Sequence, residues 1–376
     1  MKAFIIGNGV SIDVGGAPRN LIKEIFDLYD QNKDKDYTRD TCFPRFKVLV
    51  DELSSGYKEN VASLKEDGVE IDNQVFPATW TVEDIEYILT IIDLNLHNSF
   101  KLKPNIVGVD VTPSEVVSIK GFKNDEVHEF RKIIETYMVL LLQPSRIKPA
   151  NNSLQKLCDQ FIAEGDAIIT FNYDLLLEQE LWKLRKWIPL DGYLIGSLNE
   201  ADALLKKVIE EIRSVGVERS KVSLFKLHGS LNWDKYPDGD LLIGVTDHET
   251  GECYFDGIKA KGPSIGQPYQ GRHSLIGMPP SFLKVFPNKE FNELWSKAMN
   301  AVRKAEEIYI IGYRLPIADA MAHLLIGQIK RSCPVYVVKP TAKELAERIR
   351  KNFRLDNVIA LDYEFSKWVS TGFPKS

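Results

Sequence analysis

The sequence has little cysteine and no long hydrophobic run. Its cysteines are Cys42, Cys158, Cys253 and Cys333, and no two of them form a Cys-x-x-Cys pair. Isolated cysteines provide neither a disulfide framework nor the spacing of a cysteine-rich metal site, so a reducing compartment is the simpler interpretation. The longest apolar stretch, Tyr137–Leu142, is far shorter than the roughly 18 residues that span a bilayer, and the N-terminus lacks a secretory pattern. We therefore expect a cytoplasmic protein with no membrane association.

The sequence also lacks a strong excess of one charge. Lys and Arg number 48 and Asp and Glu number 53, which gives a net charge of −5. Proteins that bind nucleic acid mainly through its phosphates are typically basic, so we expect no strong nucleic-acid binding by this chain alone. The 44% of hydrophobic residues excludes global disorder, and 376 residues predict one large or two modest domains.

Short apolar runs without polar alternation are typical of parallel strands that are covered on both faces. Six such runs occur, at Ala3–Ile6, Ala167–Thr170, Val222–Leu227, Ile308–Ile311, Val335–Val338 and Val358–Leu361. Helical patterns alternate with the later runs, at Ser153–Ala163, Lys289–Ala305, Ala318–Lys330 and Ala342–Asn352. This alternation predicts an α/β fold with a doubly wound, mostly parallel, Rossmann-like sheet.

Residues 21–149 have a different pattern. Thr81–Asp84 forms a possible capping box before apolar residues at helical spacing, and Val127–Leu142 predicts a long helix that ends before Pro144. We interpret 21–149 as a large, mostly helical insert. Residues 1–20 and 150–376 would then form one Rossmann-like domain. Within it, Pro237–Gly239 predicts a hairpin turn before a strand at Leu241–Val245.

A glycine-rich segment follows the first predicted strand. Gly7-Asn8-Gly9-Val10-Ser11 would let backbone amides approach a phosphate group, close to the N-terminus of a helix. It departs from the usual dinucleotide fingerprint because Ile12 stands at the third glycine position and the next sheet strand is more than a hundred residues away. An ordinary glycine turn explains this segment equally well.

Three further strands are followed by polar residues at the edge where nucleotides bind in such sheets. Asn172 and Asp174 follow the second strand and either cap the next helix or face a ligand. His228 follows the third strand, beside a glycine, where it either has a structural role or acts as an acid or base. Gly312 follows the fourth strand, and Asp319 after it is typical of a first helical turn.

The motifs at these strand ends resemble those of the sirtuin superfamily. They are Gly-Asn-Gly-Val-Ser at 7–11, Thr-Phe-Asn-Tyr-Asp at 170–174, Lys-Leu-His-Gly-Ser at 226–230, Ile-Gly-Tyr-Arg-Leu-Pro at 311–316 and Val-Val-Lys-Pro at 337–340. In sirtuins a Gly-Ala-Gly-Ile-Ser loop, a Gln-Asn-Ile-Asp segment, a His-Gly dipeptide and a Gly-Thr-Ser loop build one NAD site. Gly16–Arg19 also resembles the sirtuin Gly-Ile-Pro-x-x-Arg loop in shortened form. The resemblance covers 1–20 and 150–376.

The chain departs from sirtuin deacylases in two respects. Their four-cysteine zinc module is missing, since only Cys253 lies in the corresponding interval; with His248 and His273 it has no zinc-ligand spacing, so we expect no metal. Phe171 stands at the glutamine of the asparagine motif, and Tyr313-Arg314 replaces the hydroxyl pair of the Gly-Thr-Ser loop. This zinc-free pattern with an insert resembles the bacterial sirtuin-like NAD hydrolases of anti-phage defence systems.

The resemblance implies roles for individual residues. Asn172 would orient the nicotinamide ribose or the attacking water, His228 would bind a ribose hydroxyl and act as general base, and Asp174 would orient the cofactor amide or brace its loop. Gly7, Gly9, Ser11 and Gly312 would cradle the diphosphate, Arg19 would lie near the nicotinamide and Lys339 beside the adenosine ribose. The implied cofactor-binding residues are therefore Gly7, Asn8, Gly9, Ser11, Arg19, Gly312, Tyr313 and Lys339.

The resemblance predicts an NAD hydrolase that releases nicotinamide and ADP-ribose, in linear or cyclic form, and so depletes NAD in anti-phage defence. It further implies a homo-oligomer, with an ATPase or another defence subunit encoded separately. Two alternatives stay open. One is an NAD-dependent protein deacylase or ADP-ribosyltransferase, which would need an acceptor. The other is a non-catalytic sensor or assembly subunit that binds NAD or ADP-ribose.

Overall fold

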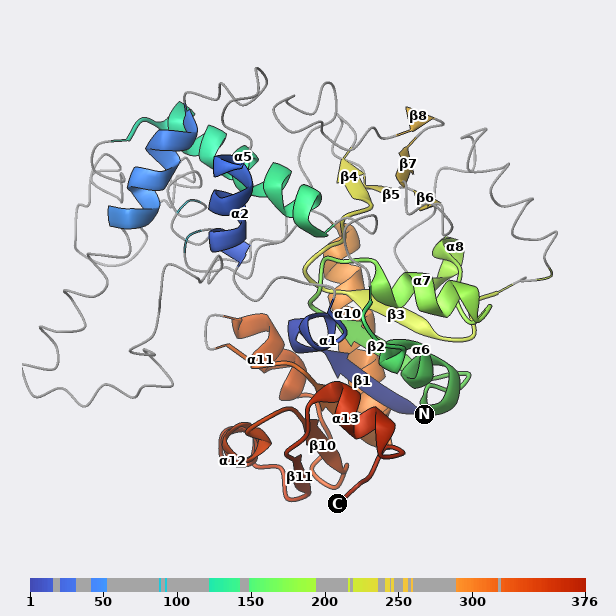
Figure 1. Ribbon diagram of the computed structural model, residues 1–376. Helices are drawn as coiled ribbons and strands as arrows, with labels where there is room; N and C mark the ends of the chain where they lie inside the picture. Colours follow the sequence, from blue (N-terminus) through green and yellow to red (C-terminus); the bar gives the residue numbers. More distant parts are fainter. Residues whose placement is uncertain are drawn as a thin grey trace, which may run out of the picture.

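The structure is a computed structural model of the 376-residue chain. It describes residues 1–15, 21–31, 42–52, 88, 92, 122–142, 149–193, 216, 219–235, 241–243, 245–246, 253–255, 258–259, 289–316 and 319–376. The first and last of these ranges, together with 149–235 and 289–316, contain most of the α/β unit (Figure 1).

A six-stranded sheet forms the centre of this unit, and all of its strands are parallel. In chain order the strands are β1 (Lys2–Ile6), β2 (Ala167–Thr170), β3 (Ser223–Lys226), β9 (Glu307–Ile311), β10 (Val335–Val338) and β11 (Val358–Leu361). Across the sheet the order is β11-β10-β9-β1-β2-β3. This is the 3-2-1-4-5-6 order of Rossmann-like dinucleotide-binding folds, in which ligands bind beyond the carboxyl ends, where the strand order reverses. In this protein the reversal lies between β1 and β9.

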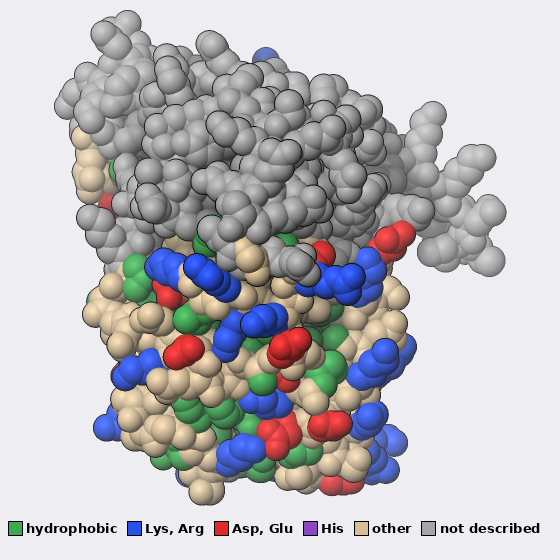
Figure 2. Space-filling view, turned by 90° about the vertical axis from the view of Figure 1, so that its right-hand side faces the viewer, with side chains coloured by type: hydrophobic (Ala, Val, Ile, Leu, Met, Phe, Trp, Pro, Cys, Tyr) green, Lys and Arg blue, Asp and Glu red, His purple; other side chains and the backbone are tan. Residues whose placement is uncertain are grey.

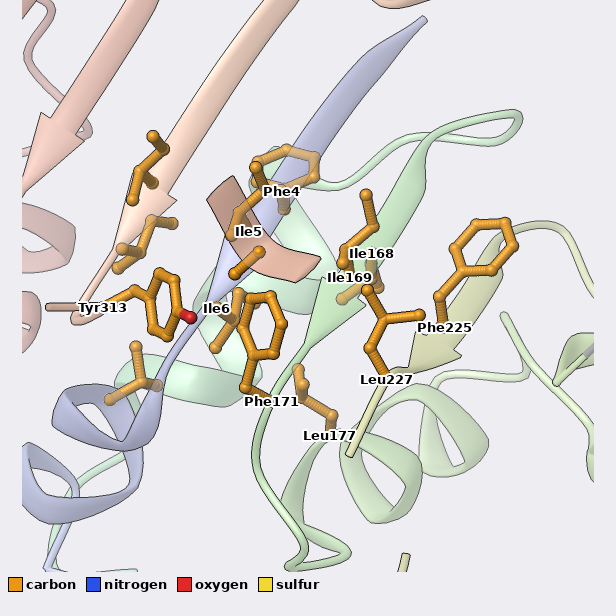
Figure 3. Close-up of a cluster of buried hydrophobic side chains, with 14 of the residues drawn as sticks. Phe4, Ile5, Ile6, Ile168, Ile169, Phe171, Leu177, Phe225, Leu227 and Tyr313 are labelled. Carbon is orange, nitrogen blue, oxygen red and sulfur yellow. The ribbon is translucent and has the colours of Figure 1, made fainter. Parts of the chain in front are cut away.

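Both faces of the sheet are covered, which explains the apolar character of its strands. Ala3 to Ile6 are fully buried, as are the central residues of β2 and β10. Phe4 on β1 stacks on Tyr309 of the neighbouring β9, with ring centroids 5.4 Å apart. Figure 3 shows the side chains of β1, β2 and β3 packed together across the sheet.

Helices pack on the two faces of the sheet (Figure 1). Helix α1 (Asn8–Asp13), α6 (Ser153–Lys156) and α13 (Phe365–Ser370) are in contact on one face, and α10 (Lys289–Lys304) and α11 (Ala320–Ile326) are in contact on the other. The remaining helices of the unit are the π-helical turn η3 (Leu157–Phe161), α7 (Leu176–Lys183), α8 (Pro189–Gly192) and α12 (Ala342–Phe353).

The six strands predicted for this sheet are confirmed, and β2, β10 and β11 have the predicted bounds. The strand predicted at Leu241–Val245 is instead divided between β5 (Leu241–Ile243) and β6 (Val245–Thr246), which belong to different sheets. The helix predicted at Ser153–Ala163 instead changes from α6 to the π-helical η3, and the chain turns after it at Gly165, which has a φ of +83°. Helix α11 starts two residues later than predicted because the Asp319 side chain caps it from the residue before its start, and it ends at Ile326, four residues earlier than predicted. Helix α1 begins at Asn8, inside the glycine-rich segment.

The described residues between 21 and 149 are mainly helical. They form α2 (Leu21–Asp30), a helix at 42–52 and α5 (Asn124–Leu142), and α2 packs against α5. Aromatic side chains join the first two: Phe43 stacks on Tyr29 with centroids 3.6 Å apart. The capping box at Thr81–Asp84 lies outside the described residues, although Ile88 and Ile92 beyond it are helical and buried. A separate helical insert stays a prediction.

Along the chain, two small antiparallel sheets follow β3 and precede α10. Strand β4 (Trp233–Lys235) pairs with β5 (Leu241–Ile243), and the predicted turn between them lies outside the described residues. The strands β6 (Val245–Thr246), β7 (Cys253–Phe255) and β8 (Ile258–Lys259) form the second sheet.

The surface and the helices add two observations. Figure 2 shows Lys and Arg side chains interspersed with Asp and Glu on one face of the described part, so that face carries no patch of a single sign. Among the helices that the structure describes, none combines the length and the apolar character that crossing a membrane requires.

Candidate functional site

The parallel sheet brings four of the polar segments predicted from the sequence to one edge. The glycine-rich segment, Phe171–Asp174, His228 and Gly312–Tyr313 follow β1, β2, β3 and β9, and these four strands are neighbours. Thr170 pairs with Lys226, so Asn172 and His228 each lie two residues beyond a paired position on adjacent strands. The parallel register therefore juxtaposes the two residues that the sequence singles out.

Asn172, Ser11 and Asp174 form a buried hydrogen-bonded group, here named the asparagine network. The Asn172 amide nitrogen donates to the hydroxyl of Ser11 at 2.9 Å and to the carbonyl oxygen of Gly7 at 3.3 Å. The Ser11 hydroxyl donates to Oδ2 of Asp174 at 2.7 Å, and Oδ1 of Asp174 accepts from the Leu176 amide at the start of α7. The network thus joins α1 to the loop between β2 and α7.

One atom of the asparagine network has no hydrogen-bond partner among the described residues. It is the Asn172 side-chain oxygen, Oδ1, in a side chain that is only 6% exposed. An unpaired buried acceptor costs about 1–3 kcal/mol relative to a satisfied one. The Asn172 side chain is therefore held through its amide nitrogen, and its oxygen can still accept a hydrogen bond from a donor. Since this oxygen is covered, neighbouring side chains must part before a ligand reaches it.

His228, Asp319 and Tyr313 form a second buried group, here named the histidine network. His228 Nε2 lies 2.9 Å from Oδ2 of Asp319, and the Tyr313 hydroxyl donates to the same oxygen at 2.9 Å. The other oxygen of Asp319 accepts from the Ala322 amide and caps α11. An ionised carboxylate only accepts hydrogen bonds, so Nε2 is the donor and, in the neutral ring, Nδ1 is the basic nitrogen.

Phe171 separates the sheet from the aromatic side chains of this network. Its ring stacks on Tyr313 with centroids 4.4 Å apart and planes 11° from parallel (Figure 3). It also meets the His228 ring in an edge-on arrangement, with centroids 4.8 Å apart. Residue 171 therefore packs against the imidazole and contributes no polar group to the site. Both rings that hydrogen-bond to Asp319 are fixed by this packing.

A third group, the lysine network, lies beneath the asparagine network. Lys226 at the end of β3 is fully buried, and its Nζ lies 2.8 Å from Oε1 of Glu178. The same Nζ donates to the carbonyl oxygens of Tyr173, at 3.4 Å, and of Asp174. The Tyr193 hydroxyl also donates to Oε1 of Glu178, at 3.0 Å. Lys226 therefore holds two consecutive carbonyl groups of the loop that carries Asn172.

Burial dominates the ionisation of this network. It raises the pKa of the Glu178 carboxyl group, and the neighbouring Lys226 opposes that shift. Burial, reinforced by the charge of Glu178, also raises the pKa of Tyr193 well above its usual value, so the phenol stays protonated and remains a donor. The group behaves as a structural ion pair with a hydrogen-bonded tyrosine.

The glycines of the site allow the segment after β1 to approach the segment after β9 closely. The Gly9 amide donates to the Gly312 carbonyl oxygen at 2.9 Å, and the Gly7 and Gly312 amides donate to Ile311 and Val338. A Cβ atom at Gly9 would lie 2.7 Å from the Gly312 oxygen, and one at Gly7 would lie 2.6 Å from Cα of Tyr313. These amides already have protein partners. Phosphate binding by the three glycines therefore stays a prediction.

The other predicted site residues are dispersed. Asn8 is exposed at the first position of α1, Lys339 is half-buried directly after β10, and Arg19 lies outside the described residues. Among the described residues no group of three or more His, Cys, Asp or Glu side chains is arranged to hold a metal ion. His248 and His273 lie outside them.

Four residues of the networks, Asp319, Lys226, Glu178 and Tyr193, were not predicted as site residues. Asp319 looked like an ordinary first-turn acid, and its cap on α11 gives no sign that it also contacts a histidine 91 positions away. Lys226 could have been noticed, because a buried strand that is mainly apolar ends in a lysine. Glu178 lies in a helix where an acidic residue is common, and only the fold reveals its pairing with Lys226.

Comparison with known proteins adds no relative. No protein-family model matches the chain, and no curated protein matches its sequence significantly. The site therefore has to be interpreted from its own geometry.

Proposed function

We propose that this chain is an NAD hydrolase that cleaves the bond between nicotinamide and ribose. One observation carries the proposal: Asn172, whose amide oxygen has no hydrogen-bond partner among the described residues, and the Asp319-bound His228 follow adjacent strands at the carboxyl edge of a sheet with the 3-2-1-4-5-6 strand order. The sirtuin-like motifs at the same strand ends also support it. A binding module would not require an oriented imidazole beside an incomplete amide.

Cleavage of this bond develops positive charge at C1′ of the ribose, as in glycoside hydrolysis. The bond between C1′ and the nicotinamide nitrogen breaks, its electron pair neutralises the pyridinium ring, and water adds to C1′ with loss of a proton. Oδ1 of Asn172 would accept a hydrogen bond from a ribose hydroxyl or from that water. Nδ1 of His228 would bind a ribose hydroxyl and take up the proton, and the charge of Asp319 would stabilise the imidazolium.

The surrounding residues would hold this pair in place. Ser11 and Asp174 fix the Asn172 amide through its nitrogen, so that the oxygen keeps one orientation. The hydroxyl of Ser11 is already engaged in this role. Diphosphate binding would then depend on the backbone around Asn8. The close packing of Gly7, Gly9 and Gly312 would support that backbone. Arg19 would lie toward the nicotinamide, and Lys339 toward the adenosine ribose.

The biological setting follows from the resemblance alone. NAD depletion in anti-phage defence, a homo-oligomeric assembly and a separately encoded ATPase or other defence subunit are part of the proposal. The products would be nicotinamide and linear or cyclic ADP-ribose.

The test is release of nicotinamide from NAD by the purified chain without any acceptor protein. We expect Asn172→Ala and His228→Ala each to lower the rate by about 100-fold or more, because each removes a group that acts on the reacting ribose. Lys351→Gln, at an exposed position of α12, is the matched control and should leave the rate unchanged. Equal rates in all four proteins would refute the proposal, and turnover that requires an acyl-lysine or another acceptor would favour a transferase.

A further inference from the structure

Two basic residues follow adjacent strands on the β9–β11 side of the site. Lys339 comes directly after β10, and Arg314 lies two residues after Gly312 on the segment that follows β9. Ile311 of β9 and Val338 of β10 are paired in register. Arg314 and Lys339, which follow these two neighbouring strands, therefore both lie at the carboxyl edge of the sheet. Lys339 lies one residue and Arg314 three residues beyond this pair, so a lysine and an exposed arginine follow neighbouring strands at the edge where the sheet is expected to bind its ligand.

A third cation, Arg348, connects this region to α12. Its Nη2 donates to the carbonyl oxygen of Arg314 at 2.5 Å and to that of Leu315 at 2.8 Å. Leu315 has a φ of +51°, a conformation that costs energy for a leucine and is held here by this contact. Arg348 thus fixes the loop that carries Arg314 beside Lys339.

The charges of Lys339 and Arg314 are not neutralised within the described residues. No described residue accepts a hydrogen bond or forms an ion pair with the Lys339 ammonium or the Arg314 guanidinium group, and Lys339 is half-buried. Burial lowers the pKa of Lys339, as do Arg314 and Arg348, while Glu344 alone acts in the opposite direction. A half-buried lysine that shares its surroundings with two arginines is an arrangement that an anion would stabilise.

The N-terminus of α12 is not this anion site. Its first amide, that of Ala342, donates to Oδ1 of Asp362 at 2.6 Å, so a carboxylate of the protein already occupies the position. Lys343 lies 3.9 Å from the same carboxylate, on the exposed side of the helix. The side chains of Lys339 and Arg314 are therefore the donors that remain.

We propose that Lys339 and Arg314 bind a phosphate group on the 2′ position of the adenosine ribose, so that the preferred substrate is a 2′-phosphorylated dinucleotide, NADP. The inference rests on the proposed function. The proposed function puts Lys339 toward the adenosine ribose. In dinucleotide-binding sheets an acidic residue beside this ribose binds the 2′-hydroxyl of NAD, whereas an arginine accommodates the 2′-phosphate of NADP. Here basic residues stand at the ends of β9 and β10. A phosphate monoester carries close to two negative charges at neutral pH, which matches a lysine and an arginine.

The experiment compares binding of 2′-phospho-ADP-ribose and ADP-ribose to the full chain by calorimetry. We expect the 2′-phosphorylated ligand to bind about tenfold or more tightly, since a charge-assisted contact typically changes affinity by that factor. Lys339→Gln and Arg314→Gln should each weaken binding of the 2′-phosphorylated ligand more than binding of ADP-ribose, and so remove most of this preference. Lys343→Gln, the same substitution four positions further along the chain, is the matched control and should keep the preference.

Equal affinity for the two ligands would overturn the inference and leave the proposed function intact. A loss of both ligands in Lys339→Gln would also overturn it, because the lysine would then contact the diphosphate that both share. Binding of neither ligand by the wild-type chain would refute the proposed function, and this inference with it. Nicotinamide release from NADP and NAD gives the second readout, where we expect the lower KM for NADP.

Discussion

The asparagine network and the histidine network have the same design around different centres. Each contains an aspartate that uses one oxygen for the first turn of the next helix, Leu176 for Asp174 and Ala322 for Asp319. The other oxygen of Asp174 accepts from a serine, whereas that of Asp319 meets a histidine and a tyrosine. In the first network the Asn172 oxygen has no donor within the described part of the chain. In the second network both oxygens of Asp319 accept hydrogen bonds.

This difference separates two tasks within one site. A network with an unpaired acceptor is stabilised by a ligand that supplies a donor, so it is suited to binding. A network that orients an imidazole through a buried carboxylate is complete without ligand, so it is suited to proton transfer. The predictions below test this division by perturbing the support of one network at a time.

The largest effect is expected for Lys226→Met, which perturbs the support of the asparagine network. It leaves the Glu178 carboxyl group buried without its cation and releases two carbonyl groups, so the free energy of unfolding should fall by about 3–5 kcal/mol. Chemical denaturation measures this change. Lys221→Met, at an exposed lysine of the preceding turn, should cost far less. The double variant Lys226→Met/Glu178→Leu should recover much of the lost free energy of unfolding. An equal loss in Lys226→Met and Lys221→Met would contradict the pairing of Lys226 with Glu178.

Asp319→Asn should affect the histidine network through the position of a proton. Asparagine can still cap α11 with its oxygen, which turns its amide nitrogen toward His228 and makes Nε2 an acceptor. Nδ1 then carries the hydrogen and cannot act as a base, so the rate of nicotinamide release should fall on the order of 100-fold to 10,000-fold. NMR of the ring nitrogens reports the tautomer.

Tyr313→Phe is the control for that variant. It removes the other donor to the same oxygen of Asp319 and leaves the His228 contact in place. We expect its rate to stay within about tenfold of wild type, because the loss of one hydrogen bond is worth roughly 1 kcal/mol. If both variants lost activity equally, the carboxylate would act on the site other than by orienting His228.

The smallest effect concerns pH. His323 binds the carbonyl oxygen of Pro316 in the loop before Asp319, and burial lowers its pKa. Because the folded-state pKa is depressed, this group's stabilisation is complete above the unfolded value of about 6.5 and is lost as pH falls through the folded value. The unfolding midpoint should therefore decrease slightly on acidification, and His323→Gln should flatten that decrease. An unchanged pH profile in the variant would show that the imidazole does not titrate with unfolding.

The sequence predicts the sheet well because continuous apolar runs such as Ala167–Thr170 can be buried only inside it. It also predicts that Asn172 and His228 lie at the same edge of the sheet, since parallel strands place whatever follows them at one edge. Side-chain contacts between elements that are far apart in the sequence are harder to predict. Asp319 reaches His228 only because α11 starts at that point, and Lys226 finds Glu178 only after β3 has packed beside α7. Local patterns record how each helix begins, not which strand it faces.

The buried pair of Lys226 and Glu178 also restricts how this sequence can diverge. A change at either position alone leaves an uncompensated charge in the interior, while a simultaneous change to apolar residues of similar volume need not be costly. An evolving lineage would have to cross an unstable intermediate to lose the pair. Descendants of the same ancestor should therefore either retain both residues or have replaced both, and the two positions should covary more tightly than Asn172 does with either.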